Sequence, residues 1–272
     1  MQDQSAPIAT PVRQVKLAGH TIHVSDDKPT FWARVGAGAW EPGALAAISA
    51  HVKPESWFLD LGAWVGPTTL LAARLGAHCI AVEADAQALR ELRGNLAANP
   101  ALAARVTVID RAVSPTPAPV TLAARRKPGD SMSSALLAQQ ADVERVRWTV
   151  DAVTPAQLAA LVPAHAPLFI KLDIEGGEFA LAPQLTPLLQ RSGPTRVLVS
   201  FHPGVLRETG APEGDIRART ALALAPFAGW RSEEIDPPTP HQMDGAPPDP
   251  QLIANGQQSD SWLFARPGPG PD

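Results

Sequence analysis

The sequence predicts a doubly wound α/β domain built on a mostly parallel sheet. Short apolar runs alternate along the chain with segments whose apolar residues recur at helical spacing. Two of the runs, Leu168 to Asp173 (LFIKLD) and Arg196 to Phe201 (RVLVSF), are apolar enough to be central strands buried on both faces. Strands that alternate with helices are typical of a parallel sheet covered by helices on both sides.

The alternation begins in the first half of the chain. Trp57 to Leu61 (WFLDL) is an apolar run that ends in a glycine-containing turn, and Thr68 to Leu75 follows it with helical spacing. His78 to Glu83 (HCIAVE) predicts the second strand, Asp85 to Ala98 predicts a helix with three leucines in phase, and Arg105 to Asp110 (RVTVID) predicts the third strand.

Two further elements complete the predicted core. Thr154 and Pro155 have the residue types of an N-cap and a first helical position, and they precede a helix at Gln157 to Leu161. Trp262 to Ala265 (WLFA) predicts the last strand.

The remaining segments predict additions to this core. Val120 to Ala123 and Val146 to Val150 indicate strands on either side of a polar turn, Gly129 to Ser134 (GDSMSS), which we expect to cover the sheet edge or the site. Many of the 29 prolines lie in Asp236 to Pro250 (DPPTPHQMDGAPPDP), a stretch that predicts a surface loop. The expected division is an N-terminal extension packed as a hairpin and helix (1–56), a core domain (57–267) with an insertion (114–150) and a proline-rich loop (236–258), and a disordered tail (268–272).

Composition excludes several classes of protein. The 272 residues include 23 Lys and Arg against 27 Asp and Glu, and a net charge of -4 argues against a protein that grips nucleic acid. The single cysteine, Cys79, excludes an intramolecular disulfide and a cysteine-only metal site. We expect a cytoplasmic protein without membrane contact, because the sequence shows no secretory signal and no run of about 18 apolar residues.

The segment with the clearest chemistry is FLDLGAWVGPTTL, Phe58 to Leu70. Asp60 ends a strand there, and Gly62 and Gly66 frame the turn into a helix, where ligands of open α/β sheets bind. Glu83 follows Gly62 by 21 residues, the spacing of an acidic residue that bonds ribose hydroxyls. Asp110 ends the third strand, where an acceptor would reach an adenine amino group.

The turn favours one adenosine-containing ligand over another. A dinucleotide site needs GxGxxG so that pyrophosphate sits on the helix N-terminus, but this turn has the pattern DxGxxxG. Asp60 at its mouth opposes pyrophosphate and suits an ammonium or sulfonium group. S-adenosylmethionine (SAM) carries both, together with a ribose and an adenine.

On these residues the chain resembles class I methyltransferases, and among them the FkbM family. DLGAWVG is similar to that family's first motif, and LFIKLDIEGGEFAL, Leu168 to Leu181, is similar to its hallmark segment. RWTVDAV, the GDSMSS turn and WEPG (Trp40 to Gly43) lie in matching order. One departure is Trp64, where the family more often has Asn or another small residue.

The resemblance implies a seven-stranded sheet and transfer of the SAM methyl group, commonly to a hydroxyl of a sugar or secondary metabolite. It assigns Asp60, Gly62, Ala63 and Gly66 to the methionine part of SAM, Glu83 to the ribose and Asp110 to the adenine. The expected partner is therefore a small-molecule or glycan acceptor.

Asp173 and His202 are the expected catalytic residues. They stand at the carboxyl ends of the fourth and fifth core strands, which face the cofactor crevice. His202, with an unperturbed pKa of about 6.5, is a candidate base, and Asp173 is a candidate base, orienting group or ligand to the cofactor ammonium. Capping of a loop before Pro203 is the alternative role of His202.

Four further residues are candidates for the acceptor side. Lys171 lies inside an apolar run, and a buried ammonium must be paired, so we expect a carboxylate neighbour such as Asp60 or Glu178. Glu175 and Glu178 are placed to order the loop or to contact the acceptor. Ser133, with the other serines of its turn, is a hydrogen-bonding candidate or part of a solvated turn.

Three alternatives and the question of a metal remain open at this stage. A nicotinamide oxidoreductase lacks its GxGxxG, a macromolecular methyltransferase would share the fold, and a non-catalytic SAM-binding module would bind without turnover. Asp173 with Glu175 offers hard oxygen ligands for Mg²⁺, but nothing in the sequence requires an ion, and we expect no metal.

Overall fold

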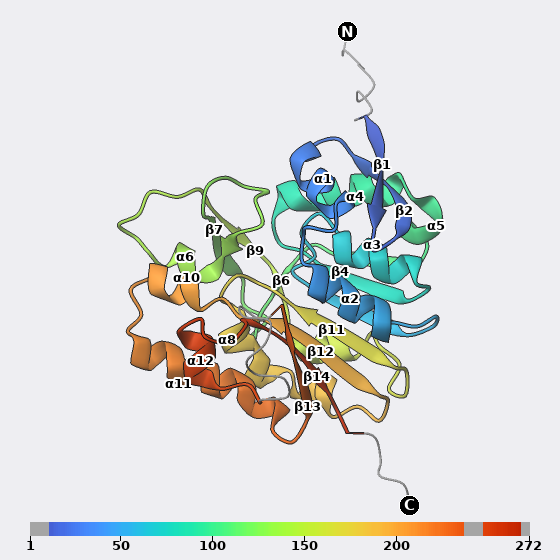
Figure 1. Ribbon diagram of the computed structural model, residues 1–272. Coiled ribbons are helices and arrows are strands. Elements are labelled where there is room, and N and C mark those ends of the chain that lie inside the picture. Colours follow the sequence, from blue (N-terminus) through green and yellow to red (C-terminus); the bar gives the residue numbers. More distant parts are fainter. Residues whose placement is uncertain (1–10, 237–246, 268–272) are drawn as a thin grey trace, which may run out of the picture.

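Six apolar runs expected from the sequence, with one further strand, form one seven-stranded sheet. The computed structural model describes residues 11–236 and 247–267 (Figure 1). The strand order is β5-β4-β3-β11-β12-β14-β13, and β14 alone among these seven is antiparallel to its neighbours. The strands are β3 (Trp57–Leu61), β4 (His78–Val82), β5 (Val106–Ile109), β11 (Leu168–Leu172), β12 (Thr195–Ser200), β13 (Arg231–Ile235) and β14 (Ser261–Ala265). The predicted doubly wound, mostly parallel α/β class is confirmed.

The topology fixes where a ligand can bind. From β3 the chain moves outward through β4 to β5, and it then returns to the other side of β3 to form β11 and β12. The order therefore reverses between β3 and β11, and the crevice outside their carboxyl ends is the expected ligand site.

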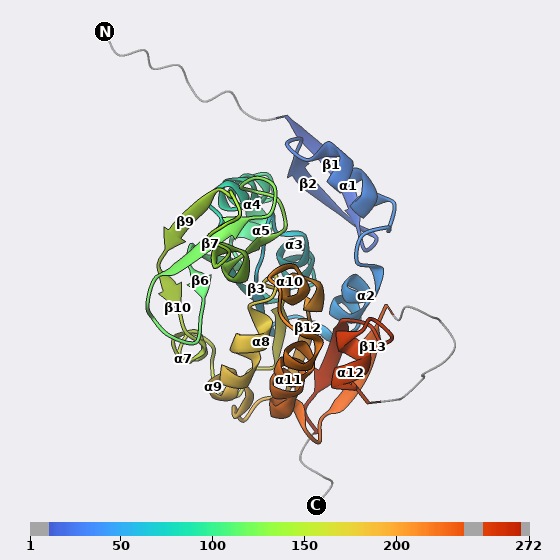
Figure 2. The ribbon, with the colours of Figure 1, turned by 90° about the vertical axis from the view of Figure 1, so that its left-hand side faces the viewer.

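Helices lie on both sides of the sheet (Figure 2), and strand alternation divides the core between its two faces. In β3, Phe58 packs into one cluster, while Leu59 and Leu61 pack into the other. The first cluster takes side chains from helices α2 (Pro42–His51), α3 (Pro67–Arg74) and α4 (Ala86–Ala97), and α5 (Pro100–Ala103) follows α4. The second takes them from α7 (Pro155–Ala159), α8 (Glu178–Leu181), α9 (Thr186–Leu189), α10 (Pro203–Glu208), α11 (Glu213–Leu224) and α12 (Pro250–Ala254), with short 3-10 turns at Ala182–Gln184 and Ala225–Phe227.

Strand β13 has no counterpart among the strands expected from the sequence. Its residues, RSEEI, alternate between exposed and partly buried positions and carry three charges. The strand lies at the end of the sheet order, beside β14. Charged side chains are common on such edges because they discourage pairing with another chain, and they hide the apolar signal that sequence patterns rely on.

The N-terminal segment adds a hairpin and two helices, where the sequence suggested one helix. Strands β1 (Val12–Leu17) and β2 (His20–Ser25) pair antiparallel, and helix α1 (Pro29–Gly36) follows before α2. Buried Leu17, Ile22 and Trp32 belong to the same core cluster as Phe58.

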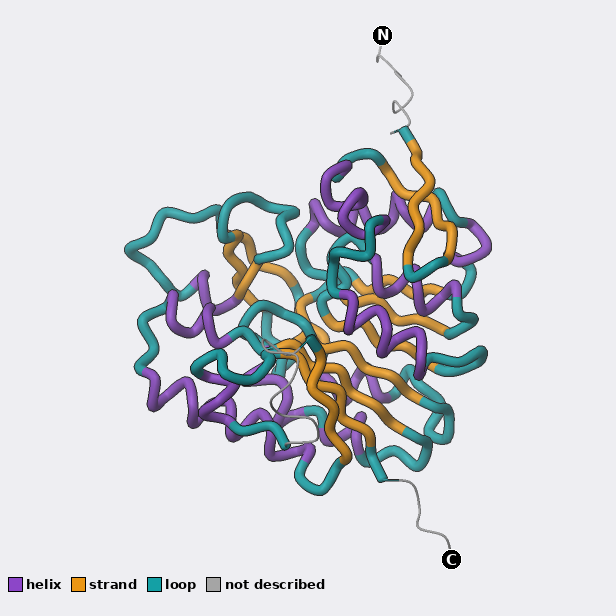
Figure 3. Tube along the Cα trace, viewed as in Figure 1, coloured by secondary structure: helices purple, strands orange, loops and turns teal. Residues whose placement is uncertain are grey.

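The expected strands of the insertion pair with each other. Strand β7 (Val120–Ala124) lies antiparallel between β9 (Arg147–Val150) and the short β8 (Ser133–Ser134), and helix α6 (Ala135–Ala138) follows β8. Strands β6 (Ala112–Val113) and β10 (Ala152–Val153) form a separate parallel pair. Figure 3 shows these small strands beside the main sheet.

Part of the predicted proline-rich loop and the whole predicted tail, residues 237–246 and 268–272, lie outside the described residues. The described part of the loop contains α12, which begins where Asp249 accepts hydrogen bonds from the N–H groups of Gln251 and Leu252. Within residues 11–236 and 247–267, no helix has the length and apolar character needed to cross a membrane.

Candidate functional site

The turn after β3 is packed so tightly that it requires glycine. Gly62 and Ala63 donate backbone hydrogen bonds to the Val82 carbonyl at 3.0 and 3.1 Å. Gly62 has a φ of 90°, and a Cβ there would lie 1.9 Å from the Asp173 carbonyl oxygen. The turn therefore brings the backbone of β3 against the segment that follows β11.

Asp60 lies beneath this turn and is fully buried. Its Oδ2 accepts hydrogen bonds from the hydroxyls of Thr68 and Thr69 at 2.7 and 2.5 Å, which anchors the first turn of α3. Its Oδ1 is buried without a hydrogen-bond partner among the described residues. Gly66 caps α3 with a φ of 86°.

Glu83 connects the turn to the next strand–helix junction. Its carboxylate accepts hydrogen bonds from the N–H groups of Trp64, Ala84 and Asp85 at 2.7, 2.8 and 2.7 Å. Burial raises the pKa of Glu83 to about 7, and these donors oppose that rise.

A cavity opens beside Glu83. We call it the inner cavity, and its walls include Gly62, Trp64, Glu83, Arg111, Ala112 and Ser133. Ser133, expected on the acceptor side, lies here and donates to Asp85 at 3.1 Å. Asp110, expected at the adenine, instead pairs with Arg93 at 3.1 Å and is 63% exposed, while the residues directly after it line the cavity.

Trp64 closes the inner cavity toward the N-terminal segment. Its φ is 49°, a left-handed conformation that Asn adopts more readily than large residues, so the backbone of Trp64 is strained. The indole N–H donates to the Gly129 carbonyl at 3.1 Å, and the ring packs edge-on against Phe31 at 4.5 Å. The hydrogen bond therefore holds the GDSMSS turn over the site, which is one of the two positions expected for that turn.

A second cavity adjoins the first at the carboxyl ends of β11 and β12. We call it the acidic cavity because five carboxylates line it: Glu41, Asp173, Glu175, Asp236 and Asp260. The cationic groups in its wall are Lys171 and His202, and Trp40 and four serines complete much of the rest.

Lys171 is paired, as its burial requires, but with a different carboxylate from those expected. Its Nζ lies 2.5 Å from Asp173 Oδ2, because residues two apart project to the same side of a strand. Burial acts to lower the pKa of Lys171, but the charges of Asp173, Glu41 and Asp60 outweigh it and raise the pKa above its usual range. Asp60 is the directly opposite residue on β3.

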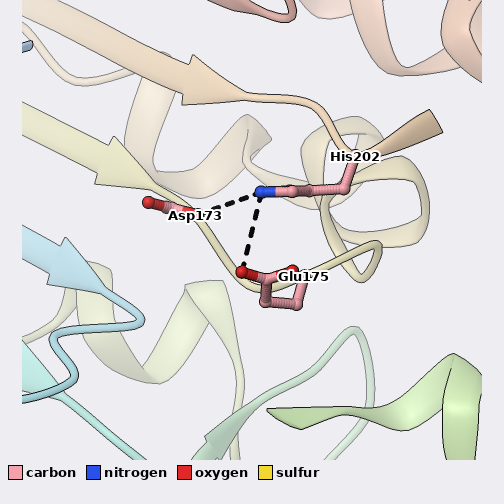
Figure 4. A group of neighbouring side chains, drawn as sticks. All are labelled: Asp173, Glu175 and His202. Atoms are coloured by element: carbon pink, nitrogen blue, oxygen red, sulfur yellow. Dashed lines mark ion pairs between the residues drawn. The ribbon is translucent and has the colours of Figure 1, made fainter. Parts of the chain in front are cut away.

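His202 is surrounded by three carboxylates, two of which, Asp173 and Glu175, are drawn in Figure 4. Its Nδ1 lies 3.0 Å from Glu178 Oε1, and its Nε2 lies 3.5 Å from Asp173 Oδ1 and 3.8 Å from Glu175 Oε1. Burial acts to lower the pKa of His202, but Glu178, Asp173 and Glu175 raise it to about 10. The three carboxylates therefore favour the charged imidazolium, and the basicity of His202 exceeds the unperturbed value assumed from the sequence.

Glu41 is a site residue that the sequence reasoning missed. Its Oε2 is buried in the acidic cavity and has no hydrogen-bond partner among the described residues. Burial raises the pKa of Glu41 to about 7. The loop that carries it is tied down by Asp236, which accepts from the Gly43 N–H at 3.1 Å. The sequence signal for this residue was in the WEPG segment, where Glu41 is a carboxylate to which no role had been assigned.

Backbone strain is concentrated around the two cavities. Among the described residues, six non-glycine residues have positive φ, and four of these line a cavity: Glu41, Trp64, Glu175 and Asp236. Such conformations cost on the order of 1–3 kcal/mol each and cluster at functional sites. The geometry therefore marks the crevice as the functional region.

No protein-family model matches this chain. No curated protein matches its sequence either. Among solved structures, it is similar to a SAM-dependent methyltransferase from Agrobacterium tumefaciens, at 12% identity and a TM-score of 0.47, over 97% of this chain and 72% of that one. It is also similar to a precorrin-6y C5,15-methyltransferase from Geobacter metallireducens GS-15, at 12% identity and a TM-score of 0.37, over 81% and 85% of the two chains.

A third similar structure is a candidate methyltransferase from Streptococcus mutans in complex with SAH, at 11% identity and a TM-score of 0.41, over 81% and 93% of the two chains. At such identities the likeness concerns the fold alone. The sheet order with only β14 reversed is that of the class I methyltransferase fold, and the fold assignment rests on this topology.

The buried carboxyl groups predict how stability depends on pH. Glu41, Glu83 and Glu175 each have a pKa raised to about 7, chiefly by burial, against about 4.5 in the unfolded chain. The folded state then binds more protons, so this stabilisation is complete below about pH 4.5 and is lost as the pH rises through 7. His202 also has a raised pKa, so its contribution to stability is likewise lost as the pH rises above about 6.5.

We therefore expect the unfolding temperature, measured calorimetrically in metal-free buffer, to fall by several degrees between pH 5.5 and pH 8. A Glu41→Gln variant should show a shallower decline. An unfolding temperature that rises over this range would contradict the assignment of raised pKa values.

Proposed function

We propose that this protein is a SAM-dependent methyltransferase of FkbM type that methylates a hydroxyl group of a sugar or secondary metabolite. The observation that carries the proposal is the junction of two unlike cavities at the switch point of the sheet. Glu83 lines the inner cavity, His202 and Glu41 line the acidic cavity, and Gly62 and Asp173 line both. A cofactor and an acceptor would meet where the cavities join.

The residues around the inner cavity fit SAM. A carboxylate has about four acceptor positions, and three N–H groups occupy Glu83, which leaves one for a ribose hydroxyl. Asp60 is fully buried and lines neither cavity, so it would support the cofactor turn from beneath, through its bonds to Thr68 and Thr69. Gly62 and Ala63 offer backbone without side-chain bulk, and the residues after Asp110 would contact the adenine. When bound, SAM supplies a methyl group already activated by its sulfonium.

The residues of the acidic cavity would orient the acceptor and remove its proton. Asp173 and His202 project from adjacent strand ends, and we propose that they hold the acceptor oxygen in line with the methyl group. The hydroxyl proton needs a base. We assign this role to Glu41, because its free oxygen lies in the cavity and its pKa lies near neutrality.

The remaining candidate residues act through Asp173, His202 and Glu41. Lys171 fixes Asp173, and Glu178 fixes His202. Glu178 is itself fully buried and receives hydrogen bonds from the Gly176 N–H. Glu175 and Ser133 line the cavity walls.

The chemistry of the acidic cavity also supports the acceptor class. Its carboxylates repel phosphate groups, which disfavours nucleic acid, and carboxylates, serine hydroxyls and tryptophan faces suit a polyhydroxylated acceptor. The resemblance to the FkbM family supports the same choice. A small molecule or glycan is therefore the proposed partner.

Calorimetric titration with SAM, SAH and NAD tests the proposal. We expect micromolar binding of the two sulfur ligands and none of NAD. Gly62→Ala should abolish binding and lower the unfolding free energy by about 2–4 kcal/mol, because its Cβ would collide with the Asp173 carbonyl in a left-handed backbone. Gly94→Ala is the matched control, since it lies within α4 with no atom within 4 Å of the added Cβ. It should keep binding and gain about 0.5–1 kcal/mol. Binding of NAD but not of SAH would refute the proposal.

A further inference from the structure

We propose that Asp173, Glu175 and His202 form a binding site for one divalent metal cation in the acidic cavity. One ligand atom from each residue lies within 4.8 Å of the other two. The measured separations of His202 Nε2 from the two carboxylate oxygens are 3.5 and 3.8 Å. Ligands about 2.1 Å from a shared metal stand roughly 3–3.6 Å apart, so small side-chain shifts complete the coordination.

Residues outside the three ligands already orient them. Glu178 accepts from Nδ1 of His202 on the side away from the cavity, which leaves Nε2 to face the carboxylates. Metal-binding histidines almost always have such a partner on their second nitrogen. Lys171 binds Oδ2 of Asp173 and leaves Oδ1 facing His202. Two of the three ligands are thus held in the orientation that coordination needs.

An independent observation also favours a cation in this cavity. Glu41 Oε2 is buried in the same cavity and finds no partner among the described residues. Five carboxylates line this cavity against Lys171 and His202. Buried acceptors without donors are rare, and a bound cation or its water molecules would supply what Glu41 lacks.

The ligand set indicates the kind of metal. Carboxylate oxygens suit Mg²⁺, Ca²⁺ and Mn²⁺, whereas imidazole suits Zn²⁺ and other transition metals. Two carboxylates with one imidazole therefore favour a first-row transition ion such as Mn²⁺ or Zn²⁺. Three protein ligands leave positions open for water or for an acceptor oxygen. The role in holding an acceptor rests on the proposed function, but the binding site itself does not.

Titration of the full chain with Mn²⁺ tests the site. The protein is first treated with EDTA and transferred to chelator-free buffer, and free Mn²⁺ is then counted by its electron paramagnetic resonance signal. We expect one equivalent to bind with micromolar affinity, and Zn²⁺ to displace it. Glu175→Gln and His202→Gln should each weaken binding at least tenfold, with folding checked by thermal melts.

Asp260→Asn is the matched control. It removes one negative charge from the same cavity but none of the three ligands, so Mn²⁺ affinity should stay within about threefold. Equal weakening by Asp260→Asn and Glu175→Gln would overturn the proposal, because it would indicate general attraction rather than coordination. Absence of saturable Mn²⁺ and Zn²⁺ binding would also overturn it. SAH titrations on the same samples report separately on the proposed function.

Discussion

Replacement of Lys171 by methionine is expected to lower the free energy of unfolding by about 3–5 kcal/mol at pH 7. The Lys171 and Asp173 side chains are only 4% and 17% exposed. Without the ammonium, buried Asp60 would lose the cation opposite it, and Asp173 would keep only His202, 3.5 Å from its Oδ1. Loss of one partner from a buried ion pair costs far more than the pair contributes over an apolar replacement.

Urea denaturation of matched variants measures this effect. Arg93→Ala is the control, because the Arg93–Asp110 pair has similar chemistry but side chains that are 54% and 63% exposed, and it should change stability by less than about 1 kcal/mol. The double variant Lys171→Met with Asp173→Asn should recover part of the loss, since it removes the stranded charge. Equal small losses for Lys171→Met and Arg93→Ala would show that the pairing does not stabilise the fold.

Replacement of Glu41 by glutamine is expected to reduce turnover by about 10²–10⁴-fold while SAH affinity stays within about threefold. Glutamine keeps the shape of the side chain but cannot take a proton from the acceptor hydroxyl. Glu41 lines the acidic cavity and is absent from the walls of the inner cavity, so cofactor binding should be preserved.

Formation of SAH from SAM, with an acceptor found by screening sugars first, measures the turnover. Glu55→Gln serves as the control, since Glu55 is a 69% exposed carboxylate that also has positive φ but pairs with His78 and Arg105 instead of lining either cavity. Turnover of Glu41→Gln within threefold of the unchanged protein would show that another group removes the proton.

The fold could be predicted where a buried element has a local run of apolar residues. Strands β11 and β12 are buried along almost their whole length, so their apolar runs were clear, whereas the charged edge strand β13 gave no such pattern. The predicted helix after Thr154 is found, and a capping box with Gln157 explains why it begins there.

The site could be predicted only in part, because local spacing does not show which distant side chains meet. The distance along the chain from Gly62 to Glu83 is set by one strand–helix–strand unit, and the structure joins them through Trp64. Glu41 approaches Lys171 only through tertiary packing, and no spacing rule connects the two. The raised pKa of His202 likewise depends on three carboxylates gathered by folding.

The shared wall between the two cavities has a consequence for finding the acceptor. Gly62, Trp64, Ser131, Asp173 and Glu175 line both cavities. We therefore expect an occupant of one cavity to change the free energy of binding in the other, and such coupling is reciprocal: each ligand alters the affinity of the other by the same factor. A genuine acceptor should thus reveal itself at equilibrium, before any product forms, as a compound that shifts the dissociation constant of SAH.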